Sequence, residues 1–471
     1  MTGSLMMGWR DYRLGFIGAP RSRRFEVPSL LHGWNRVLTP GFKFFVHPEA
    51  PLHRIQDSEG RIVLVIGDIL VTHGDSSLDD LLLRVAAGDR EPLDDLSGRF
   101  ALAVLDGEDG KIMHDPLGSQ AVFRTLEEQP VFSSHSSLIA ECLGFRVSQR
   151  IKKYMASEEY RARVTRFLPG DLTLYEEVVH LIPNNELDLQ TGRTHRYWPR
   201  ASASAQSFED LALVWDEYFR AYVRFLQPRY RPVIGLTGGL DSRAVIAAVH
   251  SMSLEAKYVT WDKMPEEEAA RIPALAEHLG APHSWVRMDE RPEGSEVDEI
   301  RQAAKFATGL TRGTPMLPAQ VAQVVESRDL FFKGLGGEVM RGPFNSRMKK
   351  HLPTDDYEQL AYALYAGNIR HTAGTEYETT TRSAIRGYLE RANYDSDLHG
   401  MDAGDLIYWE QRMGTWTAIQ HAEFSVVLNS HSAMNSRKLF NAAWGLPDSE
   451  RFGPGLLQRL IERYDPVLAS I

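Results

Sequence analysis

Residues 232–250, which read PVIGLTGGLDSRAVIAAVH, constrain the fold more than any other stretch of the chain. Apolar, strand-forming residues run up to Leu236 and stop at the polar turn formed by residues 237–242. A helical pattern follows, in which alanine and valine recur from Ala244 to Val249. A strand, a glycine turn and the start of a helix in direct succession are typical of a parallel α/β sheet.

The turn suits an anion such as phosphate. Gly238 and Gly239 let backbone N–H groups face outward, the helix start adds a partial positive charge, and Thr237 and Ser242 add hydroxyl donors. Beside a phosphate, Asp241 is expected to bind Mg²⁺. The alternative is an ordinary turn in which this aspartate caps the helix. The turn is neither a P-loop, since no Gly-Lys-Ser/Thr follows the glycines, nor a dinucleotide fingerprint, since the third glycine is missing.

Composition narrows the classes of protein. The 471 residues are enough for two or three domains, and the net charge of −10 argues against general nucleic-acid binding. The single cysteine, Cys142, excludes an intramolecular disulfide framework and a Cys-rich metal site, which fits a reducing cytoplasm. The sequence has neither an apolar run of about 18 residues nor a signal-peptide core, so we expect a cytoplasmic protein that does not contact membranes.

The first 200 residues have the pattern of a β-rich domain. Strands are predicted at residues 61–67, 98–105, 111–113, 121–123 and 131–134, and a helix begins at residue 137. The Ala/Ser stretch at residues 201–207 is predicted to be an interdomain linker.

From residue 208 onward, predicted strands alternate with amphipathic helices. Helices are predicted at residues 208–225, 265–279 and 318–326, and strands at residues 233–236, 256–261, 283–288 and 330–333. From about Tyr357 the pattern is mostly helical, with an amphipathic helix at residues 409–416. This alternation predicts a parallel doubly wound sheet, which binds ligands at the carboxyl ends of its strands.

Together these motifs resemble the asparagine synthetase family. Residues 237–242 are similar to the Ser-Gly-Gly-x-Asp-Ser loop of N-type ATP pyrophosphatases, with Thr237 in place of the first serine, and residues 334–338 (GLGGE) resemble the family's second acidic loop. Segments similar to the family's glutaminase-type domain lie at residues 96–101, 115–119, 132–134 and 168–198. The resemblance implies an Ntn-hydrolase-like αββα domain at residues 1–200 and an ATP-pyrophosphatase domain with a helical C-terminal part at residues 208–471.

The family's chemistry implies ATP and Mg²⁺ as cofactors, with the metal held by Asp241 and Glu338. The nucleotide would be bound by Leu236, Thr237, Gly238, Gly239, Asp241, Ser242, Asp262, Gly334 and Gly336. Lys333 would neutralise pyrophosphate, and Arg451 lies closest to the region where the family has a catalytic lysine. Arg243 and Arg341 are further candidates for binding phosphate or a substrate carboxylate. The sixteen histidines form no HxxxH or HxH pair, so no metal site other than that of ATP-linked Mg²⁺ is predicted.

The departures from the family are informative. Glutamine hydrolysis needs an N-terminal cysteine, whereas this sequence starts Met1-Thr2-Gly3-Ser4, and Ile66 replaces the asparagine of the oxyanion segment. We therefore expect residues 1–200 to be a relic without glutaminase activity, as in β-lactam synthetases and lasso-peptide cyclases. Leu335 stands where the family has a catalytic Glu or Tyr, and Lys438 is the last lysine, so the catalytic lysine is absent.

Three hypotheses follow. The first is an AMP-forming amide ligase that joins a small-molecule or peptide carboxylate to an amine in natural-product biosynthesis. The second is a degenerate nucleotide-binding scaffold that serves a biosynthetic partner protein. The third, a sulfur-transfer ATP pyrophosphatase acting on RNA, is disfavoured by the acidic charge and the lack of catalytic cysteines. The oligomeric state stays open, with a dimer among the alternatives.

Overall fold

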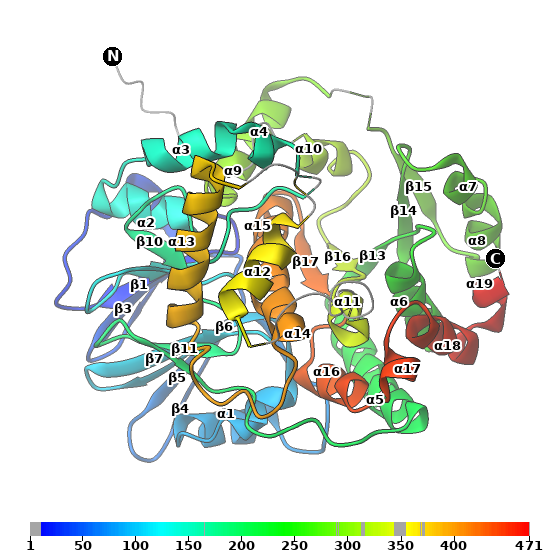
Figure 1. Cartoon of the computed structure of the whole chain (residues 1–471), viewed down its shortest axis with the longest axis horizontal. Coiled ribbons are helices and arrows are strands. Elements are labelled where there is room, and N and C mark those ends of the chain that lie inside the picture. The colour runs from blue at the N-terminus through cyan, green and yellow to red at the C-terminus, as the bar shows by residue number, and fades with distance from the viewer. Residues whose placement is uncertain are drawn as a thin grey trace.

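The computed structural model describes residues 11–163, 165–288, 290, 292–311, 316–342, 355–367, 369 and 373–470. A β-rich part, blue to cyan in Figure 1, adjoins a parallel sheet surrounded by helices. The predicted α/β architecture, with a parallel sheet and a helical C-terminal part, is confirmed at this level. Residues 1–4, on which the expectation about an N-terminal nucleophile depended, lie outside the described residues.

Two antiparallel sheets form the β-rich part, in the strand orders β10-β8-β9-β1-β3-β2 and β12-β11-β7-β6-β5-β4. The strands are β1 (Phe16–Pro20), β2 (Asn35–Leu38), β3 (Phe42–Val46), β4 (Leu52–Gln56), β5 (Ile62–Val71), β6 (Leu96–Asp106), β7 (Asp109–His114), β8 (Phe123–Thr125), β9 (Phe132–Ser133), β10 (Val178–His180), β11 (Asn185–Asp188) and β12 (Thr194–Arg196). The helical segments are η1 (Ser29–Gly33), α1 (Leu78–Ala86), η2 (Glu91–Asp94), α2 (Ser136–Leu143), α3 (Gln149–Ala156) and α4 (Glu158–Arg161). The predicted strand at residues 121–123 is displaced, because β8 begins only at Phe123.

The two sheets pack face to face because their strands carry apolar residues on both sides. On β5, Leu64 and Ile66 share the core between the sheets with Phe44 of β3. The intervening Val63 and Val65 belong to the core that includes helix α1, which packs on β5. Helix α2 packs on β8 and β9 of the other sheet. The layers are therefore helix, sheet, sheet and helix.

The parallel sheet has the order β15-β14-β13-β16-β17. Its strands are β13 (Arg231–Gly235), β14 (Lys257–Trp261), β15 (His283–Val286), β16 (Asp329–Lys333) and β17 (Asn429–Ser432), and the pairing is parallel throughout. The chain builds outward from β13 through β14 and β15 and then crosses to the other side of β13. The carboxyl ends of β13 and β16 consequently flank a topological switch point, where open α/β sheets bind ligands.

The helices around this sheet depart from the predicted ranges in places. They are α5 (Phe208–Leu226), α6 (Leu240–Ser251), α7 (Glu266–Ala269), α8 (Ile272–Leu279), α9 (Ser295–Ala307), α10 (Leu317–Val321), α11 (Gly337–Arg341), α12 (Tyr357–Ala366), α13 (Glu376–Arg391), α14 (Ala403–Ile407), η3 (Tyr408–Thr417), α15 (Ala418–Ser425), α16 (Arg437–Trp444), α17 (Asp448–Arg451), α18 (Gly455–Tyr464) and α19 (Pro466–Ser470). The single helix predicted at residues 265–279 is two helices, and Pro273 lies at the start of the second, where a missing N–H is tolerated. The helix at residues 409–416 is present as the π-helix η3.

Strand β17 lies within the mostly helical C-terminal part, and the sequence pattern did not predict it. Its sequence, Asn-Ser-His-Ser, has no apolar residue. Its buried side chains are instead hydrogen bonded: Ser430 Oγ lies 2.7 Å from His421 Nδ1, Ser432 Oγ lies 2.9 Å from His421 Nε2, and His431 Nε2 lies 3.0 Å from Asp68 Oδ2. Hydrophobic periodicity cannot reveal a strand that is stabilised in this way.

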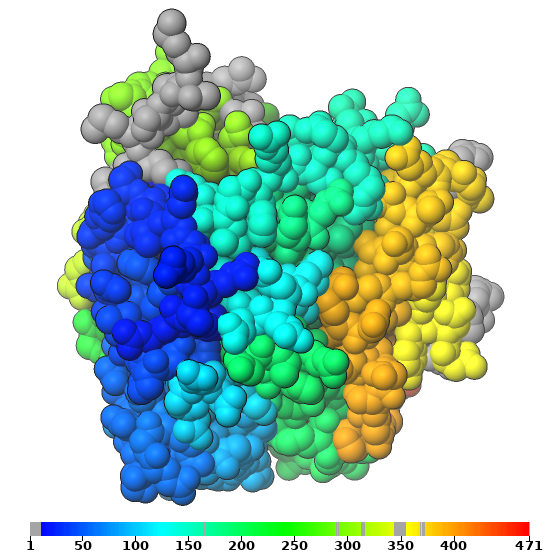
Figure 2. All heavy atoms as spheres, turned by 90° about the vertical axis from the view of Figure 1, so that its left-hand side faces the viewer, coloured from blue at the N-terminus to red at the C-terminus, as the bar shows by residue number. Residues whose placement is uncertain are grey.

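The segment after β17 is fastened to the β-rich part through Asn435, which is completely buried. Its side-chain amide donates to the carbonyl of Gly98 and to Asp115 Oδ1, both at 2.7 Å, and its oxygen accepts from Leu117 N at 2.8 Å. Its backbone carbonyl accepts from Ser97 Oγ at 2.7 Å. Figure 2 shows a second region of contact, where helix α13, drawn in gold, lies against the cyan and green segments of the β-rich part.

The predicted linker at residues 201–207 is also held by hydrogen bonds. Gln206 N donates to the carbonyl of Gly445 at 2.9 Å, and Ser202 Oγ donates to that of His399 at 2.6 Å. The domain boundary between residues 200 and 208 stays a prediction. Within the described ranges, no helix is both long and apolar enough to cross a membrane.

Replacing Asn435 should destabilise the whole chain. We expect Asn435→Ala to lower the free energy of unfolding by about 3 kcal/mol, because it leaves several buried groups without partners, at about 1–3 kcal/mol each. Urea denaturation followed by circular dichroism measures the loss. Asn35→Ala, at an exposed position of β2, serves as the control and should change stability by no more than about 0.5 kcal/mol. Equal denaturation midpoints for the two variants would contradict this role of Asn435.

Candidate functional site

Two loops meet at the switch point of the parallel sheet. The first, at residues 236–242, follows β13, and the second, at residues 334–338, follows β16. Gly334 allows their close approach: a Cβ there would lie 2.8 Å from the backbone nitrogen of Ser242. The sequence motifs therefore come together as expected from adjacent parallel strands.

Two further glycines set the shape of the second loop. Gly336 has φ = 106°, and a Cβ at this residue would overlap the carbonyl of Met434. A Cβ on Gly337 would overlap Asp241 Oδ1. The position of Asp241 against the start of α11 thus requires a residue without a side chain.

Hydrogen bonds inside the first loop fix its conformation. Thr237 Oγ1 and Ser242 Oγ lie 2.7 Å apart, and Gly239 N donates to Thr237 Oγ1 at 3.3 Å. Ser242 Oγ also lies 3.1 Å from the carbonyl of Gly239. Leu236 is buried, and its N–H donates to the carbonyl of Val259 at 2.8 Å, which ties the loop to β14.

The start of α6 has the features of an anion site. Among the described residues, no side chain caps this helix, so its first N–H groups face the loop together with the positive end of the helix dipole. Arg243 lies in the first turn and is buried, and burial followed by the charge of Arg271 lowers the pKa of its guanidinium. Glu268 approaches from α7, since a Cβ on Gly238 would lie 2.8 Å from its Cγ.

Asp241 and Glu338 bring two carboxylates to the place where the loops meet. Asp241 Oδ2 accepts from Arg341 Nη2 at 2.9 Å. Within the described part of the chain, Asp241 Oδ1 and Glu338 Oε2 are covered from solvent and have no hydrogen-bond partner. Buried carboxylate oxygens without hydrogen-bond partners are energetically unfavourable, so a cation bound between the two acids would stabilise them.

The pKa shifts agree with this geometry. Burial raises the pKa of Asp241, and Arg341 opposes the shift. Burial, followed by repulsion from Asp241, raises the pKa of Glu338 to about 7. Oxygen ligands of this kind fit Mg²⁺ and the two acids are the residues that would hold it, with phosphate oxygens completing its coordination.

The other predicted nucleotide and phosphate ligands lie at the ends of neighbouring strands. Asp262 follows β14, and its Oδ1 accepts from Met288 N at 2.8 Å, which joins the ends of β14 and β15. Lys333 is the last residue of β16 and is buried, with Nζ 3.9 Å from the ring centroid of Phe424 and 3.5 Å from Gln420 Oε1. These contacts place its ammonium group beside α15, so its role toward pyrophosphate stays a prediction.

Arg451 contacts two neighbouring helices, and its predicted catalytic role stays a prediction. It is buried, its Nε donates to the carbonyl of Met340 at 2.9 Å, and its Nη2 contacts Asp405 Oδ2 at 2.5 Å. These contacts connect α17 with α11 and α14, so the arginine positions the second loop. Leu335 packs against the apolar core and offers no group for proton transfer.

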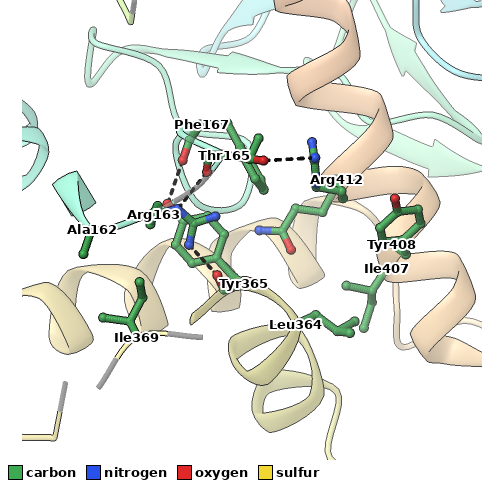
Figure 3. A pocket seen from close by; sticks show the side chains of 11 residues that line it. Ala162, Arg163, Thr165, Phe167, Leu364, Tyr365, Ile369, Ile407, Tyr408 and Arg412 are labelled. Carbon is green, nitrogen blue, oxygen red and sulfur yellow. Dashed lines mark hydrogen bonds between the residues drawn. The ribbon is translucent and has the colours of Figure 1, made fainter. Parts of the chain in front are cut away.

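A cavity of about 190 Å³ lies between a wall formed by residues 162, 163, 165 and 167 and the helices α12, α14 and η3 (Figure 3). It is lined by Ala162, Arg163, Thr165, Phe167, Leu364, Tyr365, Ile369, Ile407, Tyr408, Gln411 and Arg412. The guanidinium carbon of Arg163 lies 3.6 Å from the ring centroid of Tyr365. Arginine, tyrosine and apolar side chains together make this cavity suitable for a substrate with an apolar body and an anionic group.

Arg412 connects this cavity with the acid pair. Its Nη2 contacts Thr165 Oγ1 at 3.4 Å, and its guanidinium carbon lies 3.7 Å from the ring centroid of Trp416. Burial lowers the pKa of Arg412, while the nearby Tyr408 and Glu338 oppose that shift. From the sequence, residues 409–416 were predicted only to form an amphipathic helix. Arg412, which lies among the aromatic residues of η3, was the available signal for a pocket, whereas no signal in the sequence marked residues 162, 163, 165 and 167 on the opposite wall.

The comparisons with known proteins reveal only distant similarity. Glutamine phosphoribosylpyrophosphate amidotransferase from B. subtilis, complexed with ADP and GMP, is 12% identical over 71% of this chain and 72% of its own, with a TM-score of 0.23. A structure described as the allosteric regulatory enzyme of purine biosynthesis is 11% identical over 69% of each chain, with a TM-score of 0.25. No family model and no curated protein matches the chain.

Adding one methyl group at Gly337 should disrupt the site. In Gly337→Ala the new Cβ would overlap Asp241 Oδ1, so we expect about a hundredfold weaker binding of Mg²⁺ with a non-hydrolysable ATP analogue, measured by calorimetry. The control is Gly455→Ala, because a Cβ at that helical glycine meets nothing within 4 Å. Unchanged affinity in Gly337→Ala would place the nucleotide elsewhere.

The acid pair should also make stability depend on pH. Since the pKa of Glu338 is raised to about 7 from 4.5, the folded protein holds a proton that the unfolded chain releases between these values. Without Mg²⁺, stability should therefore fall as pH rises from about 4.5 to about 7, by up to about 3 kcal/mol.

Denaturation of the wild type and of Glu338→Gln at pH 5 and pH 8 measures this effect. The glutamine variant should lose the decrease, and added Mg²⁺ should offset it in the wild type. Glu128→Gln, at an exposed position, controls for the loss of one carboxylate and should behave as the wild type. The same pH dependence in wild type and Glu338→Gln would show that Glu338 is not the titrating group.

Proposed function

We propose that this protein is an ATP-dependent, AMP-forming ligase that activates a substrate carboxylate and joins it to an amine. The observation that carries the proposal is the pair of partnerless carboxylate oxygens on Asp241 and Glu338, at the switch point and next to the glycine turn that opens α6. The resemblance of both loops to the asparagine synthetase family supports the same chemistry.

In the proposed reaction the substrate carboxylate attacks the α-phosphorus of ATP, and the bond to the β-phosphate breaks. Pyrophosphate leaves, and the amine then displaces AMP from the acyl carbon. Mg²⁺, when bound by the two acids, would neutralise charge on the leaving group. The N–H groups at the start of α6 and the hydroxyls of Thr237 and Ser242 would hold phosphate oxygens. Arg341, which contacts Asp241, would bind a neighbouring anionic group.

The cavity in front of η3 is the proposed site of the acyl substrate. Arg412 would attract its anionic group, and the rings of Phe167 and Tyr365 would pack on its apolar part. The volume suits a small molecule or the end of a peptide. Together with the family resemblance, this supports a role in natural-product biosynthesis of the kind that lasso-peptide cyclases and β-lactam synthetases perform.

We infer that the β-rich part is an Ntn-hydrolase-like αββα domain without glutaminase activity, followed by an ATP-pyrophosphatase domain. Ile66 replaces the oxyanion asparagine, and the neighbouring Asp68 is occupied by hydrogen bonds from Tyr230 and Asn429. Burial raises the pKa of the Cys142 thiol to about 12, which makes it a poor nucleophile. The amine would accordingly come from the substrate and not from glutamine.

Two observations favour a second candidate function, that of a nucleotide-binding scaffold for a biosynthetic partner. Leu335 cannot transfer a proton, and Arg451 is engaged with Asp405 and Met340. A site without a proton shuttle would bind ATP without turning it over, unless the incoming amine is itself deprotonated.

Pyrophosphate exchange distinguishes the candidates. Incubated with ATP, labelled pyrophosphate and a panel of carboxylic acids and peptides, the ligase should exchange label into ATP and form AMP with its true acid. Asp241→Asn should lower the exchange rate by at least about a hundredfold, because it weakens the ligand of the charge-neutralising ion. Asp298→Asn, exposed on α9, should exchange as the wild type does.

Formation of ADP in place of AMP would refute the ligase proposal. Binding of Mg²⁺ and ATP with no exchange, and no pyrophosphate release when amines are also supplied, would favour the scaffold.

A further inference from the structure

A cluster of metal-binding side chains lies away from the nucleotide site, where α6, α8 and the junction of α18 with α19 meet. His250 Nδ1 lies 2.9 Å from Asp465 Oδ2, and His278 Nε2 lies 2.8 Å from the same oxygen. The ligand atoms of all three residues lie within 4.8 Å of one another. Figure 1 shows the helices involved gathered on the side of the molecule that carries the C-terminus.

The surroundings of the cluster favour positive charge. His250 and His278 both lie in the last turn of their helices, so the negative ends of two helix dipoles point toward one place. Asp465 is nearly fully buried, and its Oδ1 also accepts from Leu468 N at 2.9 Å, which fixes the carboxylate.

We propose that His250, His278 and Asp465 form a binding site for a divalent transition-metal ion, with Zn²⁺ as the ion that suits it. Two imidazole nitrogens and one carboxylate oxygen are a common ligand set for zinc, and imidazole disfavours Mg²⁺ and Ca²⁺. Ligands about 2.0–2.1 Å from a tetrahedral ion lie about 3.3 Å apart. The two distances from the histidine nitrogens to Asp465 Oδ2, 2.9 Å and 2.8 Å, therefore need to widen by only about half an ångström.

The site is accessible on one side. The side chains of His250 and His278 are 37% and 22% exposed, against 6% for Asp465. A solvent molecule can therefore fill the fourth position. The ion would join the end of α6, whose first turn follows the glycine loop, to a carboxylate 215 residues further along the chain. This inference does not depend on the proposed ligase activity.

Titration of the metal-free protein with Co²⁺ tests the proposal, because tetrahedral Co²⁺ with nitrogen and oxygen ligands absorbs strongly in the visible range. We expect one ion per chain, displacement of Co²⁺ by one equivalent of Zn²⁺, and a higher melting temperature with Zn²⁺. His278→Gln should weaken Zn²⁺ binding by at least about a hundredfold, since loss of even an outer-shell partner costs about 10–100-fold.

Two controls separate this site from others. His53→Gln removes a histidine that forms an exposed pair with Asp79 alone, and it should leave the spectrum and the affinity unchanged. Asp241→Asn should also keep the tetrahedral spectrum, which distinguishes the cluster from the nucleotide-linked acids.

Asp465 also accepts a hydrogen bond from Leu468 N in α19, so an Asp465→Asn variant would lose stability even without a bound metal. His278→Gln, whose side chain is more exposed, is therefore the variant that decides the test. Absence of a tetrahedral Co²⁺ spectrum in the wild type, or equal Zn²⁺ affinity in the wild type and His278→Gln, would overturn the proposal and leave a hydrogen-bonded His–Asp–His cluster.

Discussion

The buried hydrogen bonds of Asn435 are the constraint on which the site depends. They fasten the segment after β17 to Gly98 and Asp115 of the β-rich part. The preceding residue, Met434, carries the carbonyl against which Gly336 packs. The second acidic loop is thus held from two sides, by its own strand and by a contact that the β-rich part supports. The β-rich part therefore supports the second loop whether or not it has an activity of its own.

The two acids that these contacts hold together lower the stability of the folded chain. Asp241 and Glu338 repel each other, and two of their oxygens have no hydrogen-bond partner among the described residues. A protein of marginal stability retains such a pair where a bound cation makes use of it. Arg341 donates a hydrogen bond to Asp241, and its positive charge reduces the repulsion between the two acids in the folded chain.

The contact between the two parts of the chain includes buried polar groups beside a shared hydrophobic core. Asp68 accepts from Tyr230, Asn429 and His431, and burial raises its pKa less than these bonds lower it. Arg99 donates to Ser425 Oγ at 2.7 Å. Polar groups buried with their partners specify one placement of the β-rich part relative to the parallel sheet. Any other placement would leave these groups without hydrogen-bond partners.

The sequence by itself determined the local elements and the two loops. The glycine turn after Leu236, the strand at residues 61–67 and the helix at residues 208–225 follow from propensity and periodicity, which act between neighbours along the chain. Only the tertiary structure decided what those elements bring together. It brought Arg451 into contact with Met340, formed the cavity beside Arg412, paired Asn429–Ser432 as a strand with β16, and brought His250 next to Asp465. Each of these depends on hydrogen bonds or charges between residues far apart in sequence, and no local pattern encodes such pairings.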